Sequence, residues 1–133
     1  MDYIIIHCSA TREGRPFTVT DIDRWHRAQG WNGCGYHYVI TLDGRIQSGR
    51  PLWKRGAHCR GYNAGSIGIC YIGGLSADGK PKDTRTPQQK KALRRVLLTL
   101  RQRYPEACIV SHHTLNPGKA GPCFDAETEY ADI

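Results

Sequence analysis

Short apolar runs, separated by polar and glycine-rich stretches, set the hydrophobic pattern of this chain. Apolar runs of this length are typical of buried strands, and they fall at residues 3–6, 36–42, 66–72 and 108–111. Asp43-Gly44 predicts a tight hairpin turn after the second run, with residues 45–48 as the return strand.

A first helix is predicted from Thr20 to about residue 29. Ile22 and Trp25 recur at helical spacing, and Asp23 stands three residues after Thr20, as in a capping box. Gly30 is placed to end this helix at the C′ position.

A second helix is predicted to begin after Thr86. Pro87 suits the first helical position, and Thr86 with Gln89 forms a capping box. Pro105 ends the segment. The apolar stripe of this helix consists of Leu93, Val96, Leu97, Leu100 and Tyr104.

The order of these elements, β-α-β-β-β-α-β, predicts a mixed α/β fold with a single mixed β-sheet flanked by helices. The length of the chain fits a single domain over residues 1–133. Residues 76–86 are polar and contain glycine and proline, which predicts a surface loop.

The composition limits the class of protein. Apolar residues make up 39% and charged residues 23% of the chain, as in ordinary globular proteins. No apolar run reaches the roughly 20 residues that span a bilayer, and the start of the chain lacks the pattern of a signal peptide. We therefore expect synthesis in the cytoplasm and, for the six cysteines, reduced thiols.

The formal charge of +7 favours polyanionic partners, namely acidic cell-wall polymer, nucleic acid or an anionic membrane surface, unless it marks only a solvated basic surface. No nucleic-acid-binding motif accompanies this charge, so we expect no specific nucleic-acid partner.

Two histidines, His7 and His112, each end an apolar strand, where sites are common in α/β folds. Two such ring nitrogens can bind zinc, although most histidines considered singly are structural or surface residues. His37 follows Tyr36 on a predicted strand, so the two side chains point to opposite faces. His58 lies in a glycine-rich loop that either lines a binding groove or simply connects two elements.

Several motifs occur together and in order along the chain. They are Ile4 to Thr11 with His-Cys-Ser-Ala-Thr, Trp25-His26, Gly35 to Ile40, His58-x-x-Gly61-Tyr62-Asn63, Ser66 to Ile69, His112-His113, and Lys119-Ala120-x-Pro122-x-Phe124-Asp125. In these motifs the chain resembles the type 2 N-acetylmuramoyl-L-alanine amidases over nearly its whole length. That family includes small phage endolysins and the peptidoglycan recognition proteins.

The resemblance implies a zinc-dependent enzyme that cuts the amide between N-acetylmuramic acid and L-alanine in peptidoglycan. It implies that His7 and His112 ligate Zn²⁺ and that Tyr36 and Lys119 are the catalytic residues near the metal. The groove residues that would bind substrate are His37, His58, Arg60, Tyr62 and Asn63. A monomer is expected, acting on the cell wall after release or export by another route.

One position departs from the family pattern Lys-Ala-Cys-Pro, whose cysteine binds zinc: this chain has Gly121 there. Either the metal site is broken, or Cys123 moves in as the third ligand, or water or Asp125 completes the site. Gly118 is an extra residue before Lys119. A chain with a broken site would be an inactive peptidoglycan-binding protein. A role on an RNA polymerase, found in some phage members, cannot be transferred from these motifs.

Overall fold

A five-stranded mixed β-sheet forms the centre of the protein, for which the computed structural model describes residues 1–133. The strand order is β4-β3-β5-β1-β7. Strand β5 pairs in parallel with β3 and β1, β1 pairs in parallel with β7, and only β4 runs antiparallel to its neighbour. The bounds are β1 Tyr3–Cys8, β3 Tyr38–Ile40, β4 Ile46–Ser48, β5 Ser66–Tyr71 and β7 Cys108–Ser111.

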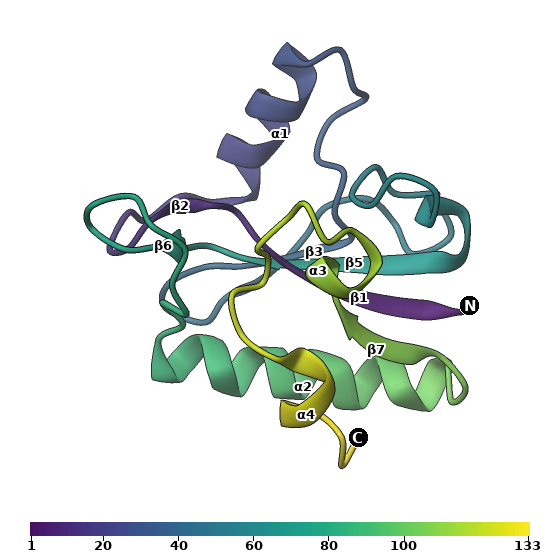
Figure 1. Cartoon of the computed structure of the whole chain (residues 1–133). Helices are drawn as coiled ribbons and strands as arrows, with labels where there is room; N and C mark the ends of the chain where they lie inside the picture. Colours follow the sequence, from purple (N-terminus) through teal and green to yellow (C-terminus); the bar gives the residue numbers. More distant parts are fainter.

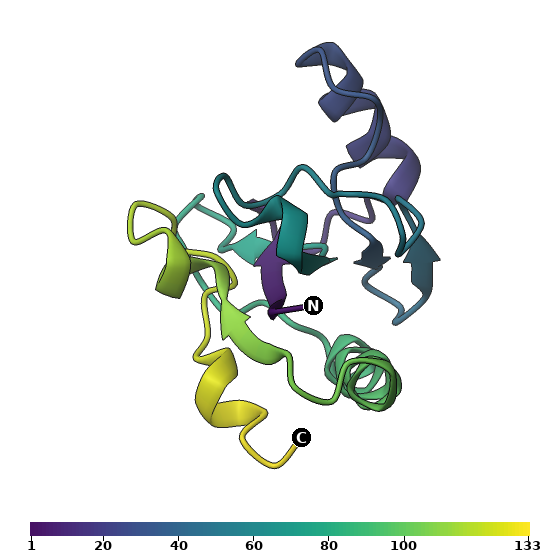
Figure 2. The same cartoon turned by 90° about the vertical axis from the view of Figure 1, so that its right-hand side faces the viewer.

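Helices cover both faces of this sheet, which confirms the predicted fold class (Figure 1). Helix α1 (Val19–Ala28) stands on one side, while α2 (Pro87–Arg103) and the short α4 (Ala126–Glu129) lie on the other (Figure 2). Helix α3 (His112–Leu115) follows β7 directly, and Asn63–Gly65 forms a 3₁₀ turn before β5. None of the helices has the length and apolar character needed to cross a membrane.

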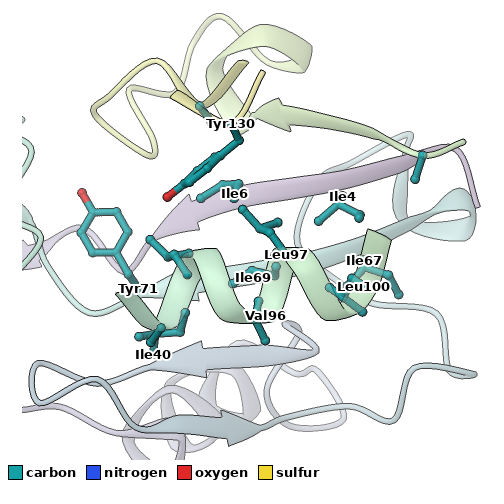
Figure 3. Close-up of a cluster of buried hydrophobic side chains, with 14 residues drawn as sticks. Ile4, Ile6, Ile40, Ile67, Ile69, Tyr71, Val96, Leu97, Leu100 and Tyr130 are labelled. Atoms are coloured by element: carbon teal, nitrogen blue, oxygen red, sulfur yellow. The ribbon is translucent and has the colours of Figure 1, made fainter. Parts of the chain in front are cut away.

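The main core lies between the sheet and α2 (Figure 3). Ile4 and Ile6 of β1 point into it, and Leu93 and Leu97 of α2 meet them, all fully buried. Ile5, between the two isoleucines, faces the opposite side, because successive residues of a strand alternate between faces. The predicted apolar stripe of α2 is therefore the face that packs on the sheet.

The start of α1 differs from the prediction. Thr18, not Thr20, is the N-cap, and its backbone N–H donates to Asp21 Oδ2 at 2.8 Å. Asp21 is the N3 residue that closes the capping box, so the helix begins two residues earlier than expected. Gly30 follows the helix with a φ of 91°, a left-handed conformation that suits glycine at the helix end.

The predicted capping box of α2 is present. The Gln89 backbone N–H donates to Thr86 Oγ1 at 3.0 Å, and the Thr86 N–H donates to Gln89 Oε1 at 2.9 Å. Gln89 is fully buried, and its side-chain Nε2 also donates to the backbone carbonyls of Ile40 and Ile72. The cap thus joins α2 to the ends of β3 and β5.

Removing this cap tests its contribution. We expect Thr86→Ala to lower the free energy of unfolding by about 1 kcal/mol, because a helix N-terminal N–H loses its acceptor. Thr99→Ala, on the exposed middle of the same helix, should change it by less than about 0.5 kcal/mol. Urea denaturation of the two variants measures the difference, and equal losses would contradict the capping role.

Other elements were missed or misplaced. The strand expected over residues 36–42 is ordered as a strand only over Tyr38–Ile40. The two-residue strands β2 (Thr11–Arg12) and β6 (Gly74–Leu75), and the four-residue helices α3 and α4, were not predicted. Cys108, which lies in an apolar run predicted to form a buried strand, is exposed at the start of β7.

Candidate metal centre and active site

The sheet brings His7 and His112 together. Ile6 of β1 pairs with Ser111 of β7, so the residues that follow them lie side by side. The Nδ1 atoms of His7 and His112 are 3.0 Å apart, and their ring centroids are separated by 4.2 Å. Two imidazole nitrogens from distant parts of the chain therefore face each other at one edge of the sheet.

The surroundings keep both rings neutral. Burial lowers the pKa of His7 well below its ordinary value, and the neighbouring His58 and His112 lower it further. Burial also lowers the pKa of His112, and the Lys119 cation adds to the effect. At neutral pH each ring therefore carries a lone pair, the form in which histidine binds metals.

A cleft of about 240 Å³ lies beside the histidine pair. Tyr36, His112 and Lys119 line it, together with the thiols Cys8 and Cys123. The ring centroid of Tyr36 is 5.1 Å from that of His7, and burial raises the pKa of the Tyr36 phenol well above its ordinary range. Tyr36 and Lys119, the two residues that the resemblance implied as catalytic, thus share one cleft with His112.

The segment that carries Lys119 and Gly121 is folded back on α3. The backbone N–H of His113 donates to the carbonyl of Gly121 at 2.8 Å, and His113 Nδ1 donates to the carbonyl of Lys119 at 2.8 Å. The buried hydroxyl of Tyr71, at the end of β5, donates to the Pro122 carbonyl at 2.6 Å. The extra residue Gly118 therefore does not displace Gly121 from the cleft.

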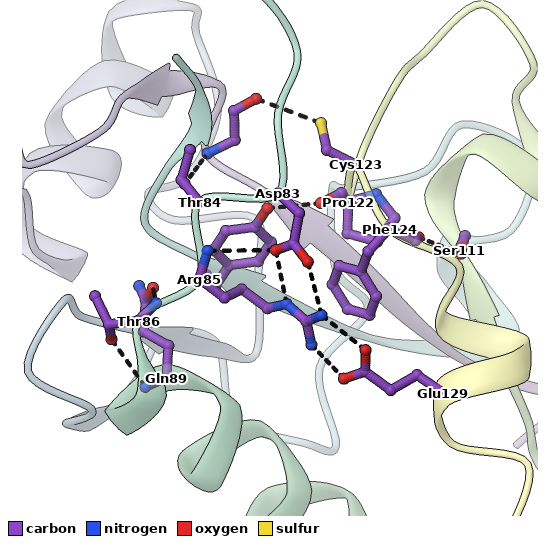
Figure 4. A network of polar contacts seen from close by, with 12 residues as sticks. Asp83, Thr84, Arg85, Thr86, Gln89, Ser111, Pro122, Cys123, Phe124 and Glu129 are labelled. Carbon is purple, nitrogen blue, oxygen red and sulfur yellow. Dashed lines mark hydrogen bonds and ion pairs between the residues drawn. The ribbon is translucent and has the colours of Figure 1, made fainter. Parts of the chain in front are cut away.

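Arg85 fixes the end of this segment (Figure 4). Its guanidinium lies 3.3 Å from the centroid of the Phe124 ring, and it forms ion pairs with Asp83 and Glu129. The Arg85 side chain is only 2% exposed, whereas the two carboxylates are 33% and 39% exposed. The buried Arg85 cation thus joins Asp83, in the loop before α2, to Phe124 and Glu129 near the C-terminus.

Loss of this cation should be costly. We expect Arg85→Met to lower the free energy of unfolding by about 2 kcal/mol, because a buried network of ion pairs and hydrogen bonds is lost while its two carboxylates stay partly exposed to water. Arg94→Met removes an exposed ion pair with Asp132 and should cost less than about 1 kcal/mol. Chemical denaturation measures the free energy of unfolding of both variants. A similar loss in the two would contradict a special role for the buried Arg85.

Position 121, where the family pattern has a cysteine, has no side chain in this protein. A Cβ placed on Gly121 would lie 3.8 Å from His112 Nδ1, 3.6 Å from Cys8 Sγ and 3.7 Å from the Cys8 nitrogen, all ordinary contacts. The backbone here thus points a side chain toward the histidine pair and has room for one. With glycine, no group of three or more His, Cys, Asp or Glu side chains is arranged to hold a metal.

The two other candidates for a third ligand are engaged elsewhere. The Cys123 thiol donates to the Gly74 carbonyl at 3.4 Å and neighbours Cys8, whose pKa is raised to about 12 by burial and by the Cys123 thiol. Asp125 is the N-cap of α4, and its carboxylate accepts the N–H and hydroxyl of Thr128. His7 and His112 fit a zinc ion as two ligands, and the third place has no protein donor.

Most of the predicted groove residues have local partners. His37 is 1% exposed; its Nε2 donates to the Lys54 carbonyl and its Nδ1 accepts the Gly68 N–H. Asn63 Oδ1 accepts the backbone N–H groups of His58 and Cys59. His58 Nδ1 lies 2.9 Å from His7 Nε2, so its ring supports the histidine pair from behind.

Two groove residues lie outside this arrangement. The Tyr62 ring packs edge-on against Tyr3, with centroids 5.6 Å apart. Arg60 is exposed. Sequence reasoning missed Arg85 and Tyr71, which hold residues 122–124 in place. An arginine flanked by Asp83 was the only signal, and its second partner, Glu129, lies too far along the chain to be paired by inspection.

The chain is similar to several known proteins. The model of the N-acetylmuramoyl-L-alanine amidase family matches residues 1–123. The endolysin of Enterobacteria phage K11 is 45% identical over 122 residues, which is 92% of this chain and 80% of that protein. Peptidoglycan-recognition protein LB of Drosophila melanogaster is 35% identical over 88 residues, 60% of this chain and 38% of that protein.

A solved structure shares the fold as well. The amidase LysC from Clostridium intestinale URNW superimposes with a TM-score of 0.80 at 28% identity, covering 97% of this chain and 80% of that one. The fold and the family match together define a peptidoglycan amidase architecture. The chain belongs to the N-acetylmuramoyl-L-alanine amidase family, near its phage endolysins.

Proposed function

We propose that this chain hydrolyses the amide between N-acetylmuramic acid and L-alanine in bacterial peptidoglycan, using a zinc ion held by His7 and His112. The observation that carries the proposal is the 3.0 Å approach of their Nδ1 atoms beside the cleft of Tyr36 and Lys119. Family membership supports the substrate class, and the charge of +7 favours an acidic wall polymer.

Each side chain has a definite part in this chemistry. His7 and His112 are neutral and offer lone pairs to the ion. Zinc, when bound, supplies a Lewis acid and lowers the pKa of water toward about 7. Tyr36 stays protonated because its pKa is raised, so its hydroxyl can donate a hydrogen bond to the reacting groups. Lys119 places a positive charge where the carbonyl oxygen becomes negative.

Release of peptides with a new L-alanine amino terminus from purified cell wall tests the proposal. We expect release in the presence of excess zinc, its loss on chelation, and its loss in His112→Ala. Lys119→Met keeps the length of the side chain without its charge and should slow release strongly. If the unaltered chain releases no peptide even with excess zinc, the proposal is wrong.

A second function is favoured by Gly121 itself. Because position 121 provides no donor, the protein would bind peptidoglycan through the same cleft without cutting it. Co-sedimentation with insoluble peptidoglycan in the absence of any peptide release would support this alternative. Failure to co-sediment would exclude it. In either case the proposed partner is the cell wall. We propose that the protein binds it as a monomer, after release from the cell or export without a signal peptide.

A further inference from the structure

The second ring nitrogen of His7 points away from the cleft, toward His58. His7 Nε2 lies 2.9 Å from His58 Nδ1, and His58 Nε2 lies 3.3 Å from the hydroxyl of Ser66 at the start of β5. The rings of His7 and His58 meet edge-on, with centroids 4.9 Å apart. Three polar side chains thus form a line that begins at the histidine pair and ends in the sheet.

The protein holds the His58 ring tightly in this line. A Cβ on Gly68 would lie 2.5 Å from His58 Cγ, and a Cβ on Gly56 would lie 2.5 Å from His58 Cδ2. Both distances are far below a van der Waals contact, so the ring fills the space that two glycines leave open. Asn63, which accepts the backbone N–H of His58, fixes the loop from the other side.

The position of one proton decides what His7 can do. A neutral imidazole has one N–H and one lone pair. His7 Nδ1 can offer a lone pair toward His112 only if the proton sits on Nε2, and that proton then needs an acceptor. His37 shows how the fold fixes a tautomer elsewhere, since backbone groups determine both of its nitrogens. For His7 the group within reach of Nε2 is His58.

We propose that His58 is a positioning residue: its Nδ1 accepts the Nε2 proton of His7 and so keeps the His7 Nδ1 lone pair directed toward His112. His58 then carries its own proton on Nε2 and donates it to Ser66. Outer partners of this kind orient a metal-binding histidine and fix its tautomer. The use of the lone pair for zinc rests on the proposed function, but the tautomer itself does not.

Nuclear magnetic resonance of the ¹⁵N-labelled, metal-free protein at neutral pH tests the tautomer directly. Two-bond ¹H–¹⁵N spectra distinguish a protonated from an unprotonated ring nitrogen. We expect the proton on Nε2 in both His7 and His58 of the unaltered chain. A proton on Nδ1 of either ring would overturn the proposal, and this readout remains decisive even if variants fold poorly.

Two variants of nearly equal size test the role of the acceptor. His58→Asn keeps an acceptor near the position of Nδ1, whereas His58→Leu removes it. We expect His7 to keep its Nε2 proton in the asparagine variant and to lose the fixed tautomer in the leucine variant. An unchanged His7 spectrum in His58→Leu would overturn the proposal.

Zinc affinity gives a second readout. Measured by competition with a chelator dye in a chain that also carries Gly121→Cys, His58→Leu should weaken binding about 10- to 100-fold and His58→Asn by only a few-fold. Equal weakening in both would show that His58 acts only through packing and would overturn the proposal. An absence of amidase activity with the expected spectra would instead refute the proposed function and leave this inference standing.

Discussion

Gly121→Cys is expected to convert a weak zinc site into a tight one. The added Cβ meets only ordinary contacts, and it lies 3.8 Å from His112 Nδ1, so the thiolate reaches the space beside the histidine pair. A third protein ligand completes the set that zinc sites commonly use. We expect affinity to rise more than about 100-fold, beyond the effect of an outer-shell partner, and amidase activity to rise with it.

The control for this variant is Gly118→Cys in the same segment. A Cβ at Gly118 lies near only Asn116, so this thiol is added away from the histidines. Zinc content of the purified proteins and titration against a competing chelator measure the effect. If both cysteine variants bind zinc equally well, the gain is a property of any added thiol. If neither binds better than the unaltered chain, position 121 is not the ligand position.

The metal-free protein is expected to lose stability as the pH falls from 7 to 5. Burial lowers the pKa of His58 to about 3, and His7 is lowered well below its ordinary value. In the unfolded chain both titrate near pH 6.5. The unfolded state therefore binds more protons throughout this window, and the stabilisation present above pH 6.5 is lost as the pH falls toward the folded-state values.

Below pH 6.5 the expected slope approaches about 1.4 kcal/mol per pH unit for each of these histidines, so the two together lose roughly 4 kcal/mol between pH 7 and 5. Urea denaturation at a series of pH values, with chelator present, measures it. The range stops at pH 5 because carboxylates begin to contribute below it. His58→Asn should reduce the slope by one histidine's share. A free energy of unfolding that stays constant from pH 7 to 5 would contradict the burial of neutral histidines.

Strong local signals made parts of the fold predictable. Thr86, Pro87 and Gln89 fix the start of α2 through bonds within one turn, so the sequence alone locates it. The apolar runs around Ile5 and Ile69 are strands buried on both faces, which leaves few alternatives to a central position. His7 and His112 were singled out because each ends an apolar run predicted to be a strand, and their pairing follows from the neighbouring parallel strands.

Features that depend on distant contacts escaped prediction. The early start of α1 was missed because Thr18 and Thr20 are both good caps, and Asp21 decides between them. The short helices α3 and α4 have little stability of their own and exist because they pack on β7. The placement of His58 behind His7 depends on Gly56 and Gly68, which lie beside its ring. The spacing of motifs along the chain does not predict that contact.

The last ten residues also have a practical meaning for anyone who shortens or fuses this protein. The family match ends at residue 123, yet Ala126 and Tyr130 beyond it belong to the main core, and Glu129 shares Arg85 with Asp83. A boundary drawn where the family match stops would open the hydrophobic interior and release the segment that carries Lys119. Tags and partner domains should be joined after Ile133, and swaps between relatives should carry this tail with them.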